Sequence, residues 1–157
     1  MIKTLEDNDV FEAIQLMNKS TQHNEYYGYE RNESVWIQYF LSLVQKQKEG
    51  SLHDLVIGYY SDNKLRGFLS ATTFNNYYTN EWVMDVKDCI VDHDYNTAIP
   101  VYRLFDAMIA HVKKHGGKHW RADSIRGEQE ALDYGRFLQR RYDAALHVSV
   151  RGVIQEN

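Results

Sequence analysis

The stretch Glu81-Trp-Val-Met-Asp-Val-Lys-Asp-Cys-Ile-Val-Asp92 is typical of a β-strand, and the rest of the chain is organised around it. A short connection, His93–Ala98, leads into a helical pattern over Ile99–His115, and a further strand is predicted at His119–Asp123. A strand that runs directly into a helix places unbonded N–H groups and the positive end of the helix dipole at the junction. The sequence therefore predicts that this junction is the place to look for a phosphate-bearing ligand.

Apolar spacing and turn residues predict the remaining elements. Three more helices are expected. One covers Asp9–Ser20, the second begins at a cap at Asn32 or Ser34 and ends at Gly50, and the third covers Glu128–Arg141. Four more strands are expected, at Ile2–Leu5, Asp54–Tyr60, Leu65–Phe74 and Ala144–Ile154, with a hairpin turn at Ser61–Lys64. The predicted class is α/β (α+β): a mixed, mostly antiparallel central sheet flanked by about four helices.

Length and composition restrict the possible functions. The 157 residues are expected to form a single domain over 1–157, and a net charge of −4 does not favour a nucleic-acid partner. The lone Cys89 excludes an internal disulfide and a Cys-rich metal site, which suits a cytoplasmic protein. The sequence shows neither a signal peptide nor an apolar run long enough to span a membrane.

The carboxylates of the central strand are the candidate catalytic groups. Strict alternation would place Glu81, Asp85, Lys87 and Cys89 on one face, and would place Asp88 on the more apolar face formed by Trp82, Met84, Val86 and Ile90. Asp88 is therefore the carboxylate expected to have a shifted pKa, and it is the candidate general base. The alternative is a hydrogen-bonded carboxylate at a strand bulge.

Other reactive side chains have structural interpretations that we favour. His111 and His115 have the i, i+4 spacing of a metal-binding pair, but no third ligand is evident, so we expect a solvated helix face and no metal. Cys89 could be a nucleophile if Lys87 lowered its pKa, although a small buried residue is the better interpretation. The Tyr-rich segment Thr21–Asn32 is expected to be a loop that lines a cleft or packs as a flap.

The order of elements resembles the GNAT fold, that of the acyl-CoA-dependent N-acyltransferases. The local similarity lies in Val91-Asp-His-Asp-Tyr95, in the helix end Ala110-His-Val-Lys-Lys-His-Gly116 and in Glu130-Ala-Leu-Asp-Tyr-Gly-Arg-Phe-Leu138. The chain is also similar to divergent GNAT-like proteins of tailed phages, which would place it in the host cytoplasm. This resemblance implies an acyl group transferred from acetyl-CoA or another acyl-CoA to an amine.

The signature loop of that family, Gln/Arg-x-x-Gly-x-Gly/Ala, is not matched. Its positions fall on Asn96, Ile99 and Val101, and Pro100 removes one N–H donor. Branched side chains at Ile99 and Val101 would obstruct the close approach of a diphosphate, whereas Asn96 or Thr97 could still cap the helix. The resemblance therefore implies acetyl-CoA as cofactor, although this sequence lacks the glycines of the family's signature loop.

Two catalytic residues are expected: Asp88 as base, from its place on the apolar strand face, and Tyr134 as acid, from the resemblance, with Tyr142 as a rival acid. The resemblance assigns the cofactor cradle to Val91, Tyr95, Asn96, Thr97, Ala98, Ile99, Val101 and Arg103. Two functions follow from these assignments. The chain is either an acyltransferase that acts on acyl-CoA and an amine acceptor, or an inactive descendant of the fold that binds a protein partner, with a homodimer left open.

Overall fold

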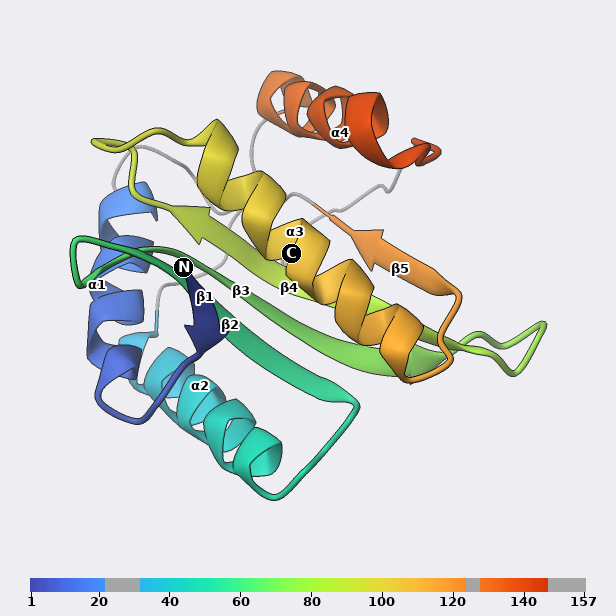
Figure 1. Ribbon diagram of the computed structural model, residues 1–157, viewed down its shortest axis with the longest axis horizontal. Helices are drawn as coiled ribbons and strands as arrows, with labels where there is room; N and C mark the ends of the chain where they lie inside the picture. The colour runs from blue at the N-terminus through green and yellow to red at the C-terminus, as the bar shows by residue number, and fades with distance from the viewer. Residues whose placement is uncertain (22–31, 124–127, 147–157) are drawn as a thin grey trace, which may run out of the picture. The chain divides into compact units, whose positions relative to one another are not determined.

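Five strands form one sheet in the described part of the computed structural model, residues 1–21, 32–123 and 128–146 (Figure 1). The strands are β1 (Ile2–Thr4), β2 (Asp54–Ser61), β3 (Lys64–Asn75), β4 (Trp82–Val91) and β5 (His119–Ala122). The helices are α1 (Asp9–Thr21), α2 (Glu33–Lys48), α3 (Ala98–Lys114) and α4 (Glu128–Tyr142). Each element coincides closely with a predicted one, and the predicted fold class is confirmed.

The sheet is antiparallel except at one edge. Its order is β1-β2-β3-β4-β5, and only β5 runs parallel to its neighbour β4. Parallel neighbours need a crossover connection, which α3 provides. The β2–β3 hairpin turns through Asp62 and Asn63, whose φ angles of 53° and 58° suit the predicted two-residue turn. Strand β4 is therefore both the last strand of the antiparallel meander and the first strand of the crossover unit.

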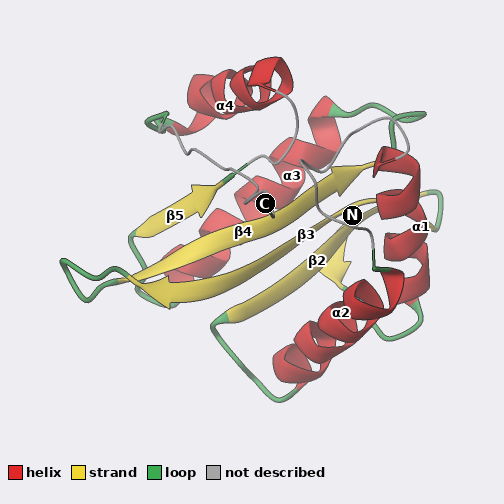
Figure 2. Ribbon diagram, turned by 180° about the vertical axis from the view of Figure 1, so that it is seen from behind, coloured by secondary structure: helices red, strands yellow, loops and turns green. Residues whose placement is uncertain are grey.

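Helices cover both faces of this sheet, with α1 and α2 on one face and α3 on the other (Figures 1 and 2). Beneath α2, the fully buried rings of Phe40 and Phe68 meet edge to face, with 5.3 Å between their centroids. On the opposite face, α3 buries Leu104, Phe105 and Met108. None of the described helices combines the length and the apolar character that a membrane crossing needs.

A β-bulge interrupts β4 at Lys87. Ser70 of β3 lies opposite Asp88, and the next residue, Ala71, lies opposite Val86, so Lys87 has no partner in the register. The alternation predicted for β4 is therefore wrong beyond Val86. Asp88 does not share a face with Trp82, Met84 and Val86. It lies on the face of Val83 and Asp85, toward α1 and α2, while Cys89 turns to the α3 side.

The described residues fall into two compact units, the first built from β1 to β5 with α1 to α3, and the second containing α4. In the second unit, the Gln139 side chain closes the end of α4 by donating to the carbonyl of Ala144 at 2.9 Å. Residues 22–31 of the predicted loop and residues 147–154 of the predicted strand lie outside the described residues. Of the loop's ends, Thr21 is the last residue of α1 and Asn32 caps α2. Ala144 and Leu146 themselves are not in a strand.

The aromatic contact beneath α2 yields a test of the core. We expect Phe68→Ala to lower the free energy of unfolding by about 3–5 kcal/mol, because it removes a fully buried ring. Phe11→Ala is the matched control, since Phe11 on α1 is 61% exposed, and its effect should stay within about 0.5 kcal/mol. Urea unfolding followed by circular dichroism measures both, and similar losses in the two variants would contradict this core.

Candidate functional site at the end of β4

The carboxyl end of β4 extends beyond its neighbour β5. The register between the two strands runs from Val83 opposite His119 to Val86 opposite Ala122. Strand β4 then continues to Val91, and among the described residues no strand pairs with this last part on the β5 side. The segment leads directly into the connection before α3 (Figure 2). The candidate base Asp88 and the candidate cradle residues are therefore consecutive parts of one chain segment.

Asp88 is held at the bulge by a hydrogen bond across two strands. The fully buried hydroxyl of Ser70 donates to Oδ2 of Asp88 at 2.6 Å. Burial raises the pKa of Asp88, and the Ser70 hydroxyl and the positive charge of Lys87 oppose the rise. Asp88 thus has the shifted pKa expected from the sequence. It also matches the alternative expectation, since it is a hydrogen-bonded carboxylate beside a bulge.

Asp85, on the same face of β4, has the opposite environment. Asp85 is 3% exposed, and its carboxylate accepts two hydrogen bonds from the Arg121 guanidinium at 3.0 and 2.9 Å and pairs with Lys87. Burial acts against ionisation here as well, but Arg121 and Lys87 outweigh it and hold the pKa of Asp85 below its usual range. Two carboxylates of one strand are therefore separated in proton affinity, which is how a site distinguishes a base from a structural anion.

The start of α3 has its backbone donors occupied. Oδ1 of Asn96 accepts from the N–H groups of Ala98 at 3.0 Å and Ile99 at 3.2 Å. Pro100 has no N–H, and the N–H of Val101 donates to the carbonyl of Thr97 at 3.4 Å. Asn96 therefore caps the helix, as one of the two predicted alternatives, whereas Thr97 makes no capping hydrogen bond.

This occupied helix start does not fit a diphosphate, because the N–H groups that would hold it are already bonded to Asn96. The predicted obstruction by two branched side chains is only partly correct. Val101 is buried to 8% exposure and packs into the core, and Ile99 alone remains 47% exposed at the helix start. Arg103 follows on the first turns of the same helix. The Asn96 side-chain amide is thus an obstacle in addition to the exposed Ile99, whereas the buried Val101 is not one.

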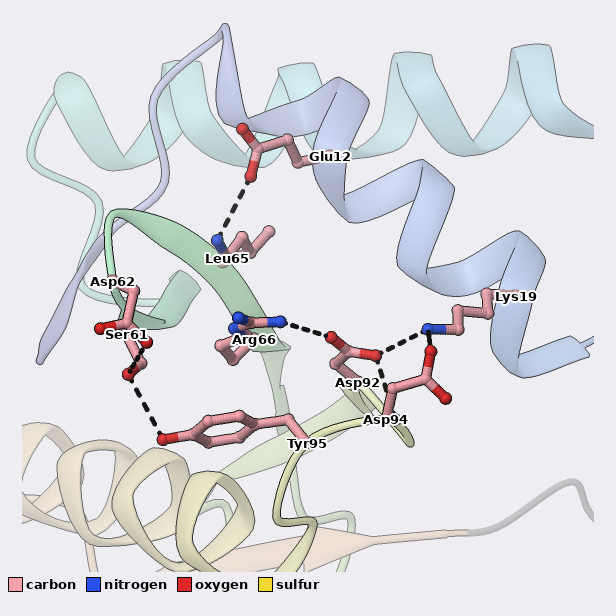
Figure 3. A network of polar contacts seen from close by, with 9 residues as sticks. All are labelled: Glu12, Lys19, Ser61, Asp62, Leu65, Arg66, Asp92, Asp94 and Tyr95. Atoms are coloured by element: carbon pink, nitrogen blue, oxygen red, sulfur yellow. Dashed lines mark hydrogen bonds and ion pairs between the residues drawn. The ribbon is translucent and has the colours of Figure 1, made fainter.

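A network of charges fixes the connection between β4 and α3 (Figure 3). Asp92, 7% exposed, accepts from Lys19 of α1 at 2.8 Å and from Arg66 of β3 at 3.0 Å. The Lys19 hydrogen bond, followed by that of Arg66, holds the pKa of Asp92 below its usual range despite its burial. The Arg66 guanidinium also lies over the Tyr95 ring, 5.1 Å from its centroid.

Sequence reasoning did not find this network. Lys19 lies 73 residues from Asp92, and Arg66 lies 26 residues from it. No local pattern marks such partners, because only the fold brings them together. Of the predicted cradle residues, Tyr95 alone joins the network, and its hydroxyl donates to Ser61 Oγ at 3.3 Å. The network therefore holds the connection in place from three different elements.

The other candidates belong to other elements. Tyr134, the expected acid, is half-buried on α4 in the second unit. Its rival Tyr142 is the last residue of the same helix. His111 Nε2 contacts the carbonyl oxygen of Leu52 at 3.0 Å, and its ring centroid is 4.6 Å from that of His115. The described residues contain no group of three or more side chains suited to a metal ion.

Comparisons with known proteins find similarity in structure only. No protein-family model matches the sequence, and no curated protein matches it. The chain is similar to the ribosomal-protein-alanine N-acetyltransferase of Brucella melitensis biovar Abortus 2308, with 19% identity, coverage of 100% and 99% of the two chains, and a TM-score of 0.67.

Two further structures share the arrangement. AAC(6')-Iy, solved with the bisubstrate analogue CoA-S-monomethyl-acetylneamine, is 11% identical, with coverage of 100% and 97% and a TM-score of 0.69. A transcriptional regulator from Bacillus halodurans C-125 is 13% identical, with coverage of 98% and 99% and a TM-score of 0.75. At these identities the similarity establishes the fold over nearly the full length of each chain.

The charge network yields a test by pH. A carboxylate with a lowered pKa in the folded state contributes stability above its unfolded pKa of about 4, and loses it as pH falls through the folded-state value. We expect Asp92→Asn to cost roughly 1–2 kcal/mol at pH 7, because Arg66 loses its charged acceptor. The difference between variant and wild type should shrink below about pH 4.

Asp94→Asn is the matched control for this variant. The Asp94 side chain is 78% exposed, and surface pairs contribute little, so the control should unfold close to wild type. Urea titrations at pH 7 and at acidic pH measure all three proteins. A loss from Asp92→Asn that stayed constant over this pH range would contradict the electrostatic origin.

Proposed function

We propose that this chain, whose fold is that of the GNAT N-acetyltransferases, transfers an acyl group from an acyl-CoA thioester to an amine. The observation that carries the proposal is Asp88, a carboxyl group of raised pKa held beside a bulge at the point where β4 separates from β5. A base works best when its pKa is brought toward the working pH, and burial moves Asp88 in that direction.

The residues fit one part of the acyl donor better than another. The pantetheine arm of CoA carries amide groups, and an extended, amide-bearing ligand pairs well with a strand edge. Among the described residues, no strand pairs with β4 beyond Val86 on the β5 side. The diphosphate does not fit the start of α3, where Asn96 holds the N–H groups. We therefore assign no step to the diphosphate and place recognition of the donor on β4.

An acyl-CoA bound along β4 would supply the acyl group as a reactive thioester. Asp88 would accept the proton that the amine loses as its nitrogen bonds to the acyl carbon. Asp85 would stay ionised, because it is committed to Arg121 and Lys87. The departing sulfur needs a proton, and Tyr134 is proposed as its donor on the family resemblance alone.

A second function is a binding module without catalysis, and the occupied start of α3 favours it. A helix start closed by its own Asn96 keeps the fold but removes the anion site. The similar fold of a protein named a transcriptional regulator is compatible with a use other than acyl transfer. The two candidates differ in whether acyl-CoA binds at all.

Ligand-dependent melting separates the two functions. We expect millimolar acetyl-CoA to raise the melting temperature, since a hundredfold excess over Kd stabilises a protein by about 2.7 kcal/mol. Adenosine 3′,5′-bisphosphate is the control ligand and should shift melting much less, because the proposed recognition lies in the pantetheine arm, which this ligand lacks. Differential scanning fluorimetry measures both ligands. Equal melting with and without acetyl-CoA would leave the binding module as the function.

The role of Asp88 is tested by its amide. We expect Asp88→Asn to lower kcat/KM by about 10²–10⁴-fold, because the amide cannot accept the proton of the amine. Thiol release from acetyl-CoA, measured over a set of amines that includes an aminoglycoside and an alanine-terminated peptide, provides the rate. Asp62→Asn on the exposed β2–β3 turn is the control and should keep full activity.

Stability separates loss of the base from unfolding. A carboxyl group whose pKa is raised by folding costs stability once it ionises, so stability falls as pH rises from about 4 through the folded-state value. Asp88→Asn should therefore be at least as stable as the wild type at neutral pH. A variant that lost activity because it melted early would not support the role of Asp88 as a base.

A further inference from the structure

Ser70 is an unusual residue for its position in the core. It lies in β3 between the apolar Leu69 and Ala71, and its side chain is fully buried on the face that α2 covers. In the register it stands directly opposite Asp88, at the point where β4 gains its extra residue. Its hydroxyl donates to Asp88 Oδ2 at 2.6 Å, a short hydrogen bond of the charge-assisted kind.

We propose that Ser70 is a positioning residue for Asp88: its hydroxyl fixes the carboxyl group beside the bulge and favours the carboxylate form that accepts a proton. This inference rests on the proposed function, because it assigns Asp88 the role of base. The register gives the physical reason. The bulge frees Asp88 from regular pairing, and the hydrogen bond from the opposite strand restores a fixed orientation.

Two described titratable side chains interact with Asp88, one on its own strand and one on α2. Lys87 on its own strand is positive but is committed to Asp85. Tyr39 on α2 faces the Ser70–Asp88 pair, and burial, followed by the negative charge of Asp88, raises the pKa of Tyr39 to about 12. Tyr39 therefore stays neutral at working pH, and Ser70 is the group whose hydrogen bond offsets the burial of Asp88.

Removing the hydroxyl measures this role directly. The titration of the Asp88 side-chain carboxyl carbon is followed by NMR in the wild type, in Ser70→Ala and in Ser70→Cys, without any ligand. We expect the pKa of Asp88 to rise by about one pH unit in Ser70→Ala, since that corresponds to the loss of one charge-assisted hydrogen bond. Ser70→Cys, with a weaker donor of similar size, should give a smaller rise.

The matched control is Thr72→Ala, which removes a hydroxyl two residues along the same strand, opposite Asp85. It should leave the Asp88 titration where it is. An unchanged Asp88 titration in both Ser70 variants would overturn the proposal, as would the same shift in Thr72→Ala. If Ser70→Ala did not fold, the Ser70→Cys comparison would decide the question by the same measurement.

The pH–rate profile with acetyl-CoA and an amine connects this role to function. In Ser70→Ala, the apparent pKa on the acidic side of the kcat/KM profile should move to higher pH by the same amount as the pKa measured by NMR. A serine with a purely structural role would not cause this shift. An apparent pKa that stayed fixed while the pKa measured by NMR moved would overturn the assignment to catalysis. If neither the wild type nor any variant released thiol, the proposed function would be contradicted. The NMR comparison alone would then decide whether Ser70 controls the pKa of Asp88.

Discussion

One extra residue in β4 determines how the site is built. Lys87 has no partner on β3, so the strand changes face between Val86 and Asp88. Without it, Asp88 would point with Val86 toward α3, away from Ser70. With it, Asp85 and Asp88 share a face, and the parallel pairing with β5 ends at Val86, just before the bulge. A single insertion thus re-aims a carboxylate at the same point where the strand edge opens.

The helices and strands could be predicted because their signals are local. The apolar stripe of α1, the cap of α2 at Asn32 and the turn at Asp62 and Asn63 each arise within a few residues. The bulge could not be predicted this way. Strict alternation assumes a regular register, and the residue types around Lys87 show no departure from that alternation. The Asp92 network was equally hidden, because its partners are joined only by folding.

The family resemblance predicted the right fold but only part of the reason for its altered helix start. Ile99 and Val101 replace the expected glycines, yet Val101 belongs to the core beneath α3. The group that closes the helix start is Asn96, which the resemblance placed at a ligand-binding position. A side chain that satisfies two N–H groups stabilises the helix and competes with any anion for the same donors. At the start of α3, Asn96 therefore occupies two N–H groups while the side chain of Ile99 remains exposed.

The environment of Asp88 is the strongest argument that the fold retains a chemical task. Burial disfavours the ionisation of Asp88, a cost that an apolar residue of similar size would avoid, although it would also lose the hydrogen bond from Ser70. Asp85 and Asp92 are different, since each has cationic partners that offset the cost of burying its carboxylate and lower its pKa. Asp88 has one neutral hydroxyl at hydrogen-bond distance and a lysine that is committed to Asp85. A carboxyl group of raised pKa, held by one described hydroxyl beside a bulge, supports the proposed role of Asp88 in proton transfer.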